Sequence, residues 1–152
     1  MGSSYVSCLV YDVLIYYDVV NSKFIPGLAE SWEVSPDALS LTYHLRKGVQ
    51  FSDGWGEFTA EDLKYNFLNQ ASPSSVGKAT AAQMIESMDV LDPFTLVIHF
   101  KKESPTFLGQ FSYGEGGICQ GIVSKKYVGT VLFSPYIEVS VGCVLSRLWQ
   151  RL

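Results

Sequence analysis

The clearest pattern in the chain is a strict alternation of apolar and polar residues over positions 39–46. Leu39, Leu41, Tyr43 and Leu45 alternate with Ser40, Thr42, His44 and Arg46. A period of two predicts a β-strand with one buried face, because successive side chains of a strand point to opposite sides of a sheet. The turn-forming sequence Ser35-Pro36-Asp37 precedes the alternation, so we expect this strand to follow a tight turn.

A second apolar segment lies near the N-terminus. Residues 13–17 read Val-Leu-Ile-Tyr-Tyr and predict a strand, because β-branched and aromatic residues favour strands. We expect a helix over about residues 4–11 before this strand. Turn-forming Asn21 and Ser22 follow it, and then comes a short, mostly buried segment that contains Leu28, Ala29, Trp32 and Val34.

The beginning of a helix is marked at Thr59. Thr59 can cap the helix, and Asp62 stands three residues later, where a capping-box partner belongs. Phe58 and Leu63 occupy the positions of a hydrophobic staple across the helix start. The sequence therefore predicts a helix from Thr59 to about Asn69.

Three further elements are expected between residues 78 and 111. Apolar residues at helical spacing favour a second helix over residues 78–87, with one stripe formed by Ala81, Ile85 and Met88. Asp92-Pro93 separates two apolar runs and is typical of a β-hairpin turn; the flanking residues are Val90, Leu91, Leu96, Ile98 and Phe100. We expect a short helix over residues 106–111 and a glycine-rich loop over residues 113–121.

Composition places the chain among globular proteins. Its 152 residues are 47% hydrophobic and 17% charged, which excludes intrinsic disorder for most of its length. The net charge is -4 and no cluster of Lys and Arg exceeds two residues, so we expect no nucleic-acid partner. No apolar run is long enough to span a bilayer, and residues 1–8 lack the features of an export signal, so the chain as written is expected to stay in the cytoplasm.

Four segments together carry a resemblance to a known family. They read VYDVL at 10–14, PGLAESWE at 26–33, HLRKGVQF at 44–51 followed by Asp53-Gly54, and FTAEDLKY at 58–65. In this order and spacing they resemble the extracellular solute-binding proteins, family 5, of peptide and nickel ABC importers. The resemblance covers about residues 4–128. The family usually has Gly where Ala38 stands here.

The resemblance implies a mixed α/β fold. Residues 1–128 are expected to be a fragment of lobe I, chiefly its accessory subdomain, in a class II periplasmic binding protein-like fold. Residues 129–152 are expected to be a divergent tail, because composition and pattern change there: residues 130–152 hold one acid, Glu138, and no Lys. A frameshifted or spliced reading is one hypothesis for this tail, and a divergent strand with a terminal helix is the other.

The implied function is that of a substrate-binding component of an ABC importer. Such a protein binds peptides or a related solute in the periplasm or at the extracellular face of the membrane and delivers them to the permease, without a cofactor and without breaking a bond. A chain that resembles so limited a portion of the family is expected to bind solute poorly alone. The alternative is a free-standing interaction module that self-associates through the apolar tail and binds no solute.

Few residues qualify for a chemical role. Phe111 and Tyr113, beside the glycine-rich loop, are the candidates for a ligand-facing position. His44 and His99 lie on polar faces of predicted strands without a nearby acid or thiol motif, so we expect solvated histidines and no metal site. Cys119 has no base placed near it and is not expected to be a nucleophile. The three cysteines match no zinc, redox or disulfide pattern: Cys8, Cys119 and Cys143.

Four carboxylates gather within ten positions, at Asp53, Glu57, Glu61 and Asp62. Such a group could imitate a calcium loop or an acid/base pair. Turn formation explains Asp53, and helix capping explains Asp62, since negative charge at a helix N-terminus is stabilising by itself. We therefore expect neither an enzyme nor a metal-binding protein.

Overall fold

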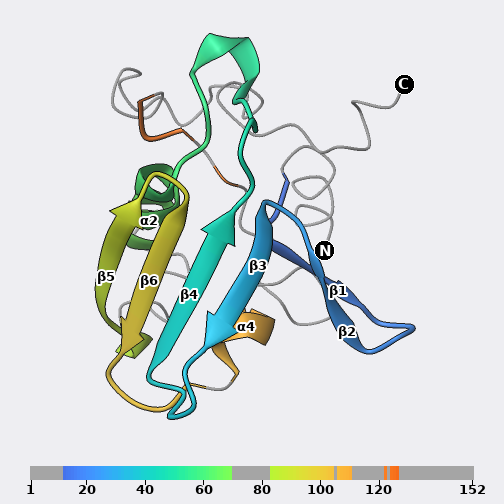
Figure 1. The fold of residues 1–152 in the computed structure, drawn as a ribbon, viewed down its shortest axis with the longest axis vertical. Helices are drawn as coiled ribbons and strands as arrows, with labels where there is room; N and C mark the ends of the chain where they lie inside the picture. Colours follow the sequence, from blue (N-terminus) through green and yellow to red (C-terminus); the bar gives the residue numbers. More distant parts are fainter. Residues whose placement is uncertain (1–11, 70–82, 105, 111–121, 123, 127–152) are drawn as a thin grey trace, which may run out of the picture.

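The computed structural model describes residues 12–69, 83–104, 106–110, 122 and 124–126, which form a β-hairpin beside a four-stranded sheet (Figure 1). The hairpin consists of β1 (Ile15–Asp18) and β2 (Lys23–Pro26). The sheet has the order β3-β4-β6-β5 and is antiparallel throughout. Its strands are β3 (Ala29–Val34), β4 (Ser40–Leu45), β5 (Ile85–Asp92) and β6 (Thr95–Phe100). This arrangement confirms the mixed α/β fold.

Among the described residues, two helices cover one face of the sheet and none covers the other, which we call the open face (Figure 1). They are α2 (Ala60–Asn69) and α4 (Phe107–Gln110), and a single turn of 3-10 helix, η1 (Ser52–Gly54), lies between β4 and α2. Phe107 links the helices to the sheet, because its ring centroid lies 6.1 Å from that of Phe67 in α2 and 4.6 Å from that of Phe100 in β6. The hydrophobic core therefore lies between the sheet and the helices.

The alternation that predicts the strand over residues 39–45 is confirmed in β4. Leu41, Tyr43 and Leu45 are buried toward the helices, while the residues between them are half-buried on the open face. The register sets Leu41 opposite Ile98 and Tyr43 opposite Leu96 on β6. The predicted hairpin of β5 and β6 is also confirmed, with its turn at Pro93-Phe94.

The predicted helix at Thr59 is confirmed as α2, but the second helix expected over residues 78–87 is wrong for residues 85–87. These residues belong to β5, and residues 78–82 lie outside the described part of the chain. The register of β5 against β6 shifts between Ile85 and Ser87. Such an irregularity adds a residue on one strand, so the buried Ile85 and Met88 stand three positions apart, as they would in a helix.

The strand predicted at residues 13–17 is confirmed over Ile15–Tyr17, whereas the helix expected over residues 4–11 lies outside the described residues.

The backbone before β1 passes very close to Gly27. A Cβ atom on Gly27 would lie 2.3 Å from the carbonyl oxygen of Val13 and 2.9 Å from that of Leu14. The amide of Gly27 donates to the Leu14 carbonyl at 3.1 Å. Glycine is required here because the two backbones touch.

The segment expected to be mostly buried forms β3, but only some of its apolar residues are buried. Leu28 and Ala29 are buried and Trp32 is half-buried, but Val34 is 50% exposed. Trp32 packs edge-on against Phe24 of β2, with ring centroids 6.4 Å apart and planes at 88°. This contact ties the hairpin to the sheet and confirms that Trp32 is a packing residue.

The tight turn predicted at Ser35-Pro36-Asp37 joins β3 to β4. The Ser35 hydroxyl donates to a carboxylate oxygen of Asp37 at 2.5 Å, and the Ala38 amide donates to the Ser35 carbonyl at 2.8 Å. Ala38 closes the turn with a φ of 52°, in the left-handed region that favours glycine. The position at which the resembling family usually has Gly is therefore a strained one in this chain.

Candidate functional site

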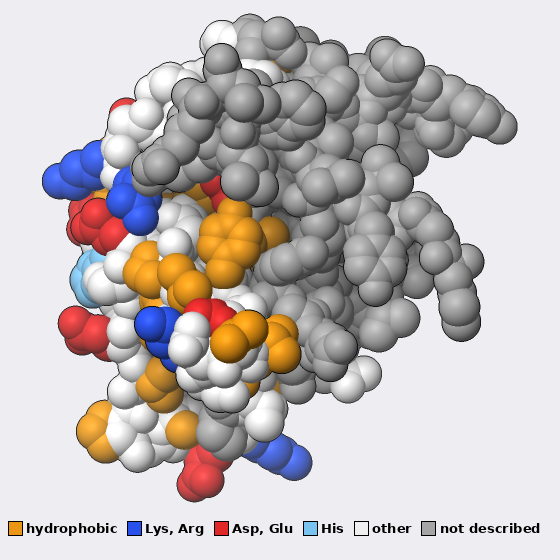
Figure 2. Space-filling model, turned by 90° about the vertical axis from the view of Figure 1, so that its right-hand side faces the viewer, with side chains coloured by type: hydrophobic (Ala, Val, Ile, Leu, Met, Phe, Trp, Pro, Cys, Tyr) orange, Lys and Arg blue, Asp and Glu red, His pale blue; other side chains and the backbone are white. Residues whose placement is uncertain are grey.

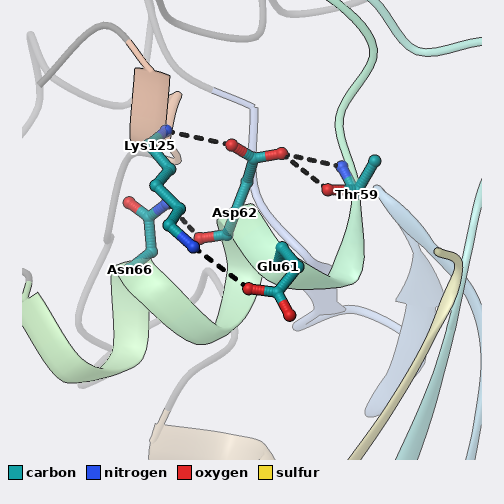
Figure 3. Close-up of polar contacts among 5 residues, drawn as sticks. All are labelled: Thr59, Glu61, Asp62, Asn66 and Lys125. Atoms are coloured by element: carbon teal, nitrogen blue, oxygen red, sulfur yellow. Dashed lines mark hydrogen bonds and ion pairs between the residues drawn. The ribbon is translucent and has the colours of Figure 1, made fainter. Parts of the chain in front are cut away.

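A polar cluster at the N-terminal end of α2 joins two parts of the chain that are distant in sequence (Figure 3). We call it the α2 junction; its residues are Thr59, Glu61, Asp62, Asn66 and Lys125. Lys125 belongs to the returning segment, residues 122 and 124–126, which comes back to α2 from beyond α4. The α2 junction thus brings together α2 and a segment about sixty residues further along the chain.

Asp62 lies at the centre of the α2 junction and uses both carboxylate oxygens. Oδ2 accepts hydrogen bonds from the Thr59 amide at 3.1 Å and from the Thr59 hydroxyl at 2.8 Å. Oδ1 accepts a hydrogen bond from the backbone amide of Lys125 at 2.9 Å. The role of Asp62 as capping-box partner is confirmed. Its contact with Lys125 has no signal in the local sequence, because 63 positions separate the two residues.

The other contacts of the α2 junction differ in burial. Asn66 is 2% exposed, and its side-chain amide donates to the backbone carbonyl of Asp62 at 2.7 Å. Lys125 Nζ lies 3.1 Å from a carboxylate oxygen of Glu61, but both side chains are more than half exposed. Exposed ion pairs contribute little to stability, so the partly buried hydrogen bonds of the Asp62 carboxylate hold the α2 junction together.

The returning segment makes further contacts with the described residues. Ile122 is buried in the hydrophobic core. Ser124 is 1% exposed, and its hydroxyl has no hydrogen-bond partner among the described residues. Lys126 Nζ lies 3.8 Å from where a Cβ atom on Gly56 would stand. The segment therefore lies beside the turn before α2 as well as beside the helix itself.

Three carboxylates near α2, those of Glu57, Glu61 and Asp62, serve local structure. Glu57 accepts a hydrogen bond from the Gly48 amide at 2.6 Å, and Glu61 pairs with Lys125. Asp53 lies in η1. Asp62 accepts three hydrogen bonds with its two carboxylate oxygens, and all three donors belong to the chain itself.

The two histidines lie on the open face of the sheet, and each pairs with an acid from a neighbouring strand. His99 Nε2 is 3.1 Å from a carboxylate oxygen of Asp89 in β5, and His44 Nε2 is 3.8 Å from one of Glu33 in β3. The sequence pattern missed these partners because strand pairing supplies them. In the part of the chain that the structure describes, no group of three or more His, Cys, Asp or Glu is placed to hold a metal ion.

Charged residues of both signs are interspersed on the side of the molecule drawn in Figure 2. No helix among the described residues is long and apolar enough to cross a membrane. The ligand-facing candidates Phe111 and Tyr113, the glycine-rich loop and all three cysteines lie outside the described residues. A ligand-facing position for Phe111 and Tyr113 therefore stays a prediction.

Comparison with known proteins shows what this fold is similar to. The family model described as bacterial extracellular solute-binding proteins, family 5 (middle), matches residues 23–127. Heme-binding protein A of Haemophilus influenzae is 34% identical over an alignment that covers 86% of this chain and 27% of that protein.

Two solved structures add similarity of fold. The periplasmic binding protein DppA of Helicobacter pylori, in complex with peptide STSA, superposes with a TM-score of 0.68 at 30% identity, over 86% of this chain and 28% of DppA. NikZ of Campylobacter jejuni, in complex with Ni(L-His), gives 0.66 at 29% identity, over 80% of this chain and 23% of NikZ. The chain thus spans about a quarter of the length of the proteins it matches.

The fold is therefore that of part of a periplasmic binding protein of the class II type. With the family model matching residues 23–127 of the 152, the chain belongs to the bacterial extracellular solute-binding proteins of family 5.

Proposed function

We propose that this chain is part of the substrate-binding component of an ABC importer, in which residues 1–128 form a fragment of lobe I, chiefly its accessory subdomain. The observation that carries the proposal is the family match over residues 23–127. Relatives are named for heme binding or solved with a peptide or a nickel complex. The proposed protein binds a peptide or a related solute in the periplasm or at the extracellular face and delivers it to the permease.

The geometry suits a wall of a binding protein better than a catalytic centre. Asp62, Glu57 and Glu61 are each engaged with groups of the chain itself. The sheet is braced on one face by α2 and α4. In the proposed mechanism this subdomain moves as part of one lobe while two lobes close over the solute by a hinge. No bond is broken, and we propose Phe111 and Tyr113 as the residues that face the solute.

A chimera tests the proposal. Residues 23–127 replace the corresponding segment of Helicobacter pylori DppA, whose solved complex holds peptide STSA. Calorimetry with that peptide is expected to give a dissociation constant within about tenfold of DppA itself. A chimera that melts cooperatively, as DppA does, but binds about a hundredfold more weakly would show that this segment is no working part of a peptide-binding lobe.

The apolar tail supports a second proposal of a different class. Residues 130–152 are mostly apolar and carry three charged side chains, Glu138, Arg147 and Arg151. Apolar segments with few charges promote association. As the alternative function, we propose that the chain is a free-standing interaction module that self-associates through residues 129–152 and binds no solute. Sedimentation of the chain over a range of concentrations is expected to show dimers or larger species if the tail associates, and a strict monomer counts against it.

A further inference from the structure

We propose that Asp62 is the positioning residue that seats the returning segment on α2, so that the cap of the helix and the return of the chain form together. Figure 3 shows the Asp62 carboxylate between Thr59 on one side and Lys125 on the other. The proposal concerns how the subdomain is closed and does not depend on which solute the protein binds.

One carboxylate serves two parts of the chain. Oδ2 of Asp62 holds the amide and hydroxyl of Thr59 within the cap of α2, and Oδ1 holds the amide of Lys125. Asp62 is only 8% exposed, so water offers little replacement for a lost donor. A buried charged oxygen without a partner is costly. Release of the returning segment would therefore also weaken the first turn of α2.

Two other contacts of the described part of the returning segment do not fix its position as strictly. Ile122 contributes burial in the core, which is non-directional. The ion pair between Lys125 and Glu61 is more than half exposed on both sides, and such pairs are weak. The hydrogen bond between Asp62 and the Lys125 amide is directional and partly buried, so it is suited to set the register of the segment on the helix.

The donor at position 125 is a backbone N–H, and this allows a sharp pair of variants. Lys125→Pro removes the N–H, whereas Lys125→Ala keeps it and removes only the ion pair with Glu61. Lys125 and Lys126 have helical backbone where a helical turn begins. Proline is tolerated at the first position of a helix, so the Pro variant is compatible with the local backbone.

Amide hydrogen exchange of the whole 152-residue chain, followed by mass spectrometry, tests the proposal. Lys125→Pro is expected to speed exchange in the first turn of α2, residues 60–63, by about tenfold or more. Lys125→Ala is expected to stay within about twofold of the parent chain. Exchange in β4 and β6 should not change in either variant.

Two results would overturn the proposal. In the first, the Pro and Ala variants exchange alike in the first turn of α2, which would mean that the amide of Lys125 does not matter. In the second, exchange rises equally in β4 and β6, which would mean general destabilisation. If Lys125→Pro does not fold, a comparison of Asp62→Ala with Glu61→Ala tests the proposal instead. Asp62→Ala should speed hydrogen exchange at residues 124–126 by about tenfold, and Glu61→Ala should not.

Discussion

Gly27 lies where two stretches of backbone touch, and no other residue fits there. A Cβ atom would stand 2.3 Å from the Val13 carbonyl oxygen, far inside the contact distance. We expect Gly27→Ala to lower the free energy of unfolding by about 3 kcal/mol, because a backbone must move to make room. Urea unfolding measures this loss.

Gly48 provides the control for Gly27→Ala. Gly48 has a φ of 76° but nothing within 4 Å of an added Cβ. Gly48→Ala is therefore expected to cost only the strain of the left-handed conformation, about 1 kcal/mol. Equal losses for the two variants would show that the close contact at Gly27 is unimportant.

Ala38 is a residue whose replacement should stabilise the protein. Its φ of 52° is unfavourable for any residue with a Cβ atom and is freely adopted by glycine. We expect Ala38→Gly to raise the free energy of unfolding by about 1 kcal/mol, since relief of the strain outweighs the greater freedom of glycine in the unfolded chain. An unchanged or lower urea midpoint would contradict this account of the turn.

The burial of Tyr43 predicts that the free energy of unfolding depends on pH. Complete burial raises the pKa of its hydroxyl far above the ordinary value, so the folded protein keeps the proton while the unfolded chain loses it above about pH 10. The stability that Tyr43 provides is thus present below that pH and declines as the pH rises above it. We expect the parent chain to lose about 1 kcal/mol more per pH unit than Tyr43→Phe. Parallel stability curves for the two chains, measured by urea unfolding above pH 10, would contradict the prediction.

At the scale of elements, the two faces of β6 should respond very differently to truncation. Ile98 is fully buried and stands between Leu41 of β4 and Met88 of β5, while the adjacent Val97 lies half-buried on the open face. We expect Ile98→Ala to cost about 3 kcal/mol through the cavity that it leaves. Val97→Ala is expected to cost less than about 1 kcal/mol. Similar shifts of the thermal midpoint would show that the core does not lie where the structure places it.

Elements with a regular period could be predicted from the sequence, and those with an irregularity could not. The alternation around Tyr43 and the cap at Thr59 place β4 and α2 correctly, because period and capping are local properties. The register shift near Ser87 gives the buried residues of β5 the spacing expected of a helix, so the sequence pattern does not identify this strand. A shift of this kind depends on the partner strand, which a local pattern does not contain.

The same distinction applies to the candidate site. The bond between Asp62 and Thr59 follows from a spacing of three residues, whereas the bond to Lys125 depends on the tertiary fold. The acids beside His44 and His99 come from neighbouring strands. Which acid lies beside each histidine depends on the order of the strands in the sheet, and the local sequence pattern does not contain that order.

At the scale of the whole molecule, the chain should bind solute weakly by itself. It spans about a quarter of the relatives that it matches, and in the proposed function the second wall of the cleft belongs to the remainder of such a protein. We expect no affinity for peptide STSA tighter than about 1 mM. Calorimetry with DppA as the positive control checks this, and micromolar binding by this chain would contradict it.

The measurement that tests the central claim most directly is to sequence the coding DNA far to either side of the codons for residues 127–152. The claim is that the chain is the lobe I portion of a solute-binding protein. It predicts that another reading frame continues the family pattern downstream and that an export signal lies upstream. An intact frame with unrelated sequence on both sides would contradict it and would favour a free-standing subdomain that acts through association.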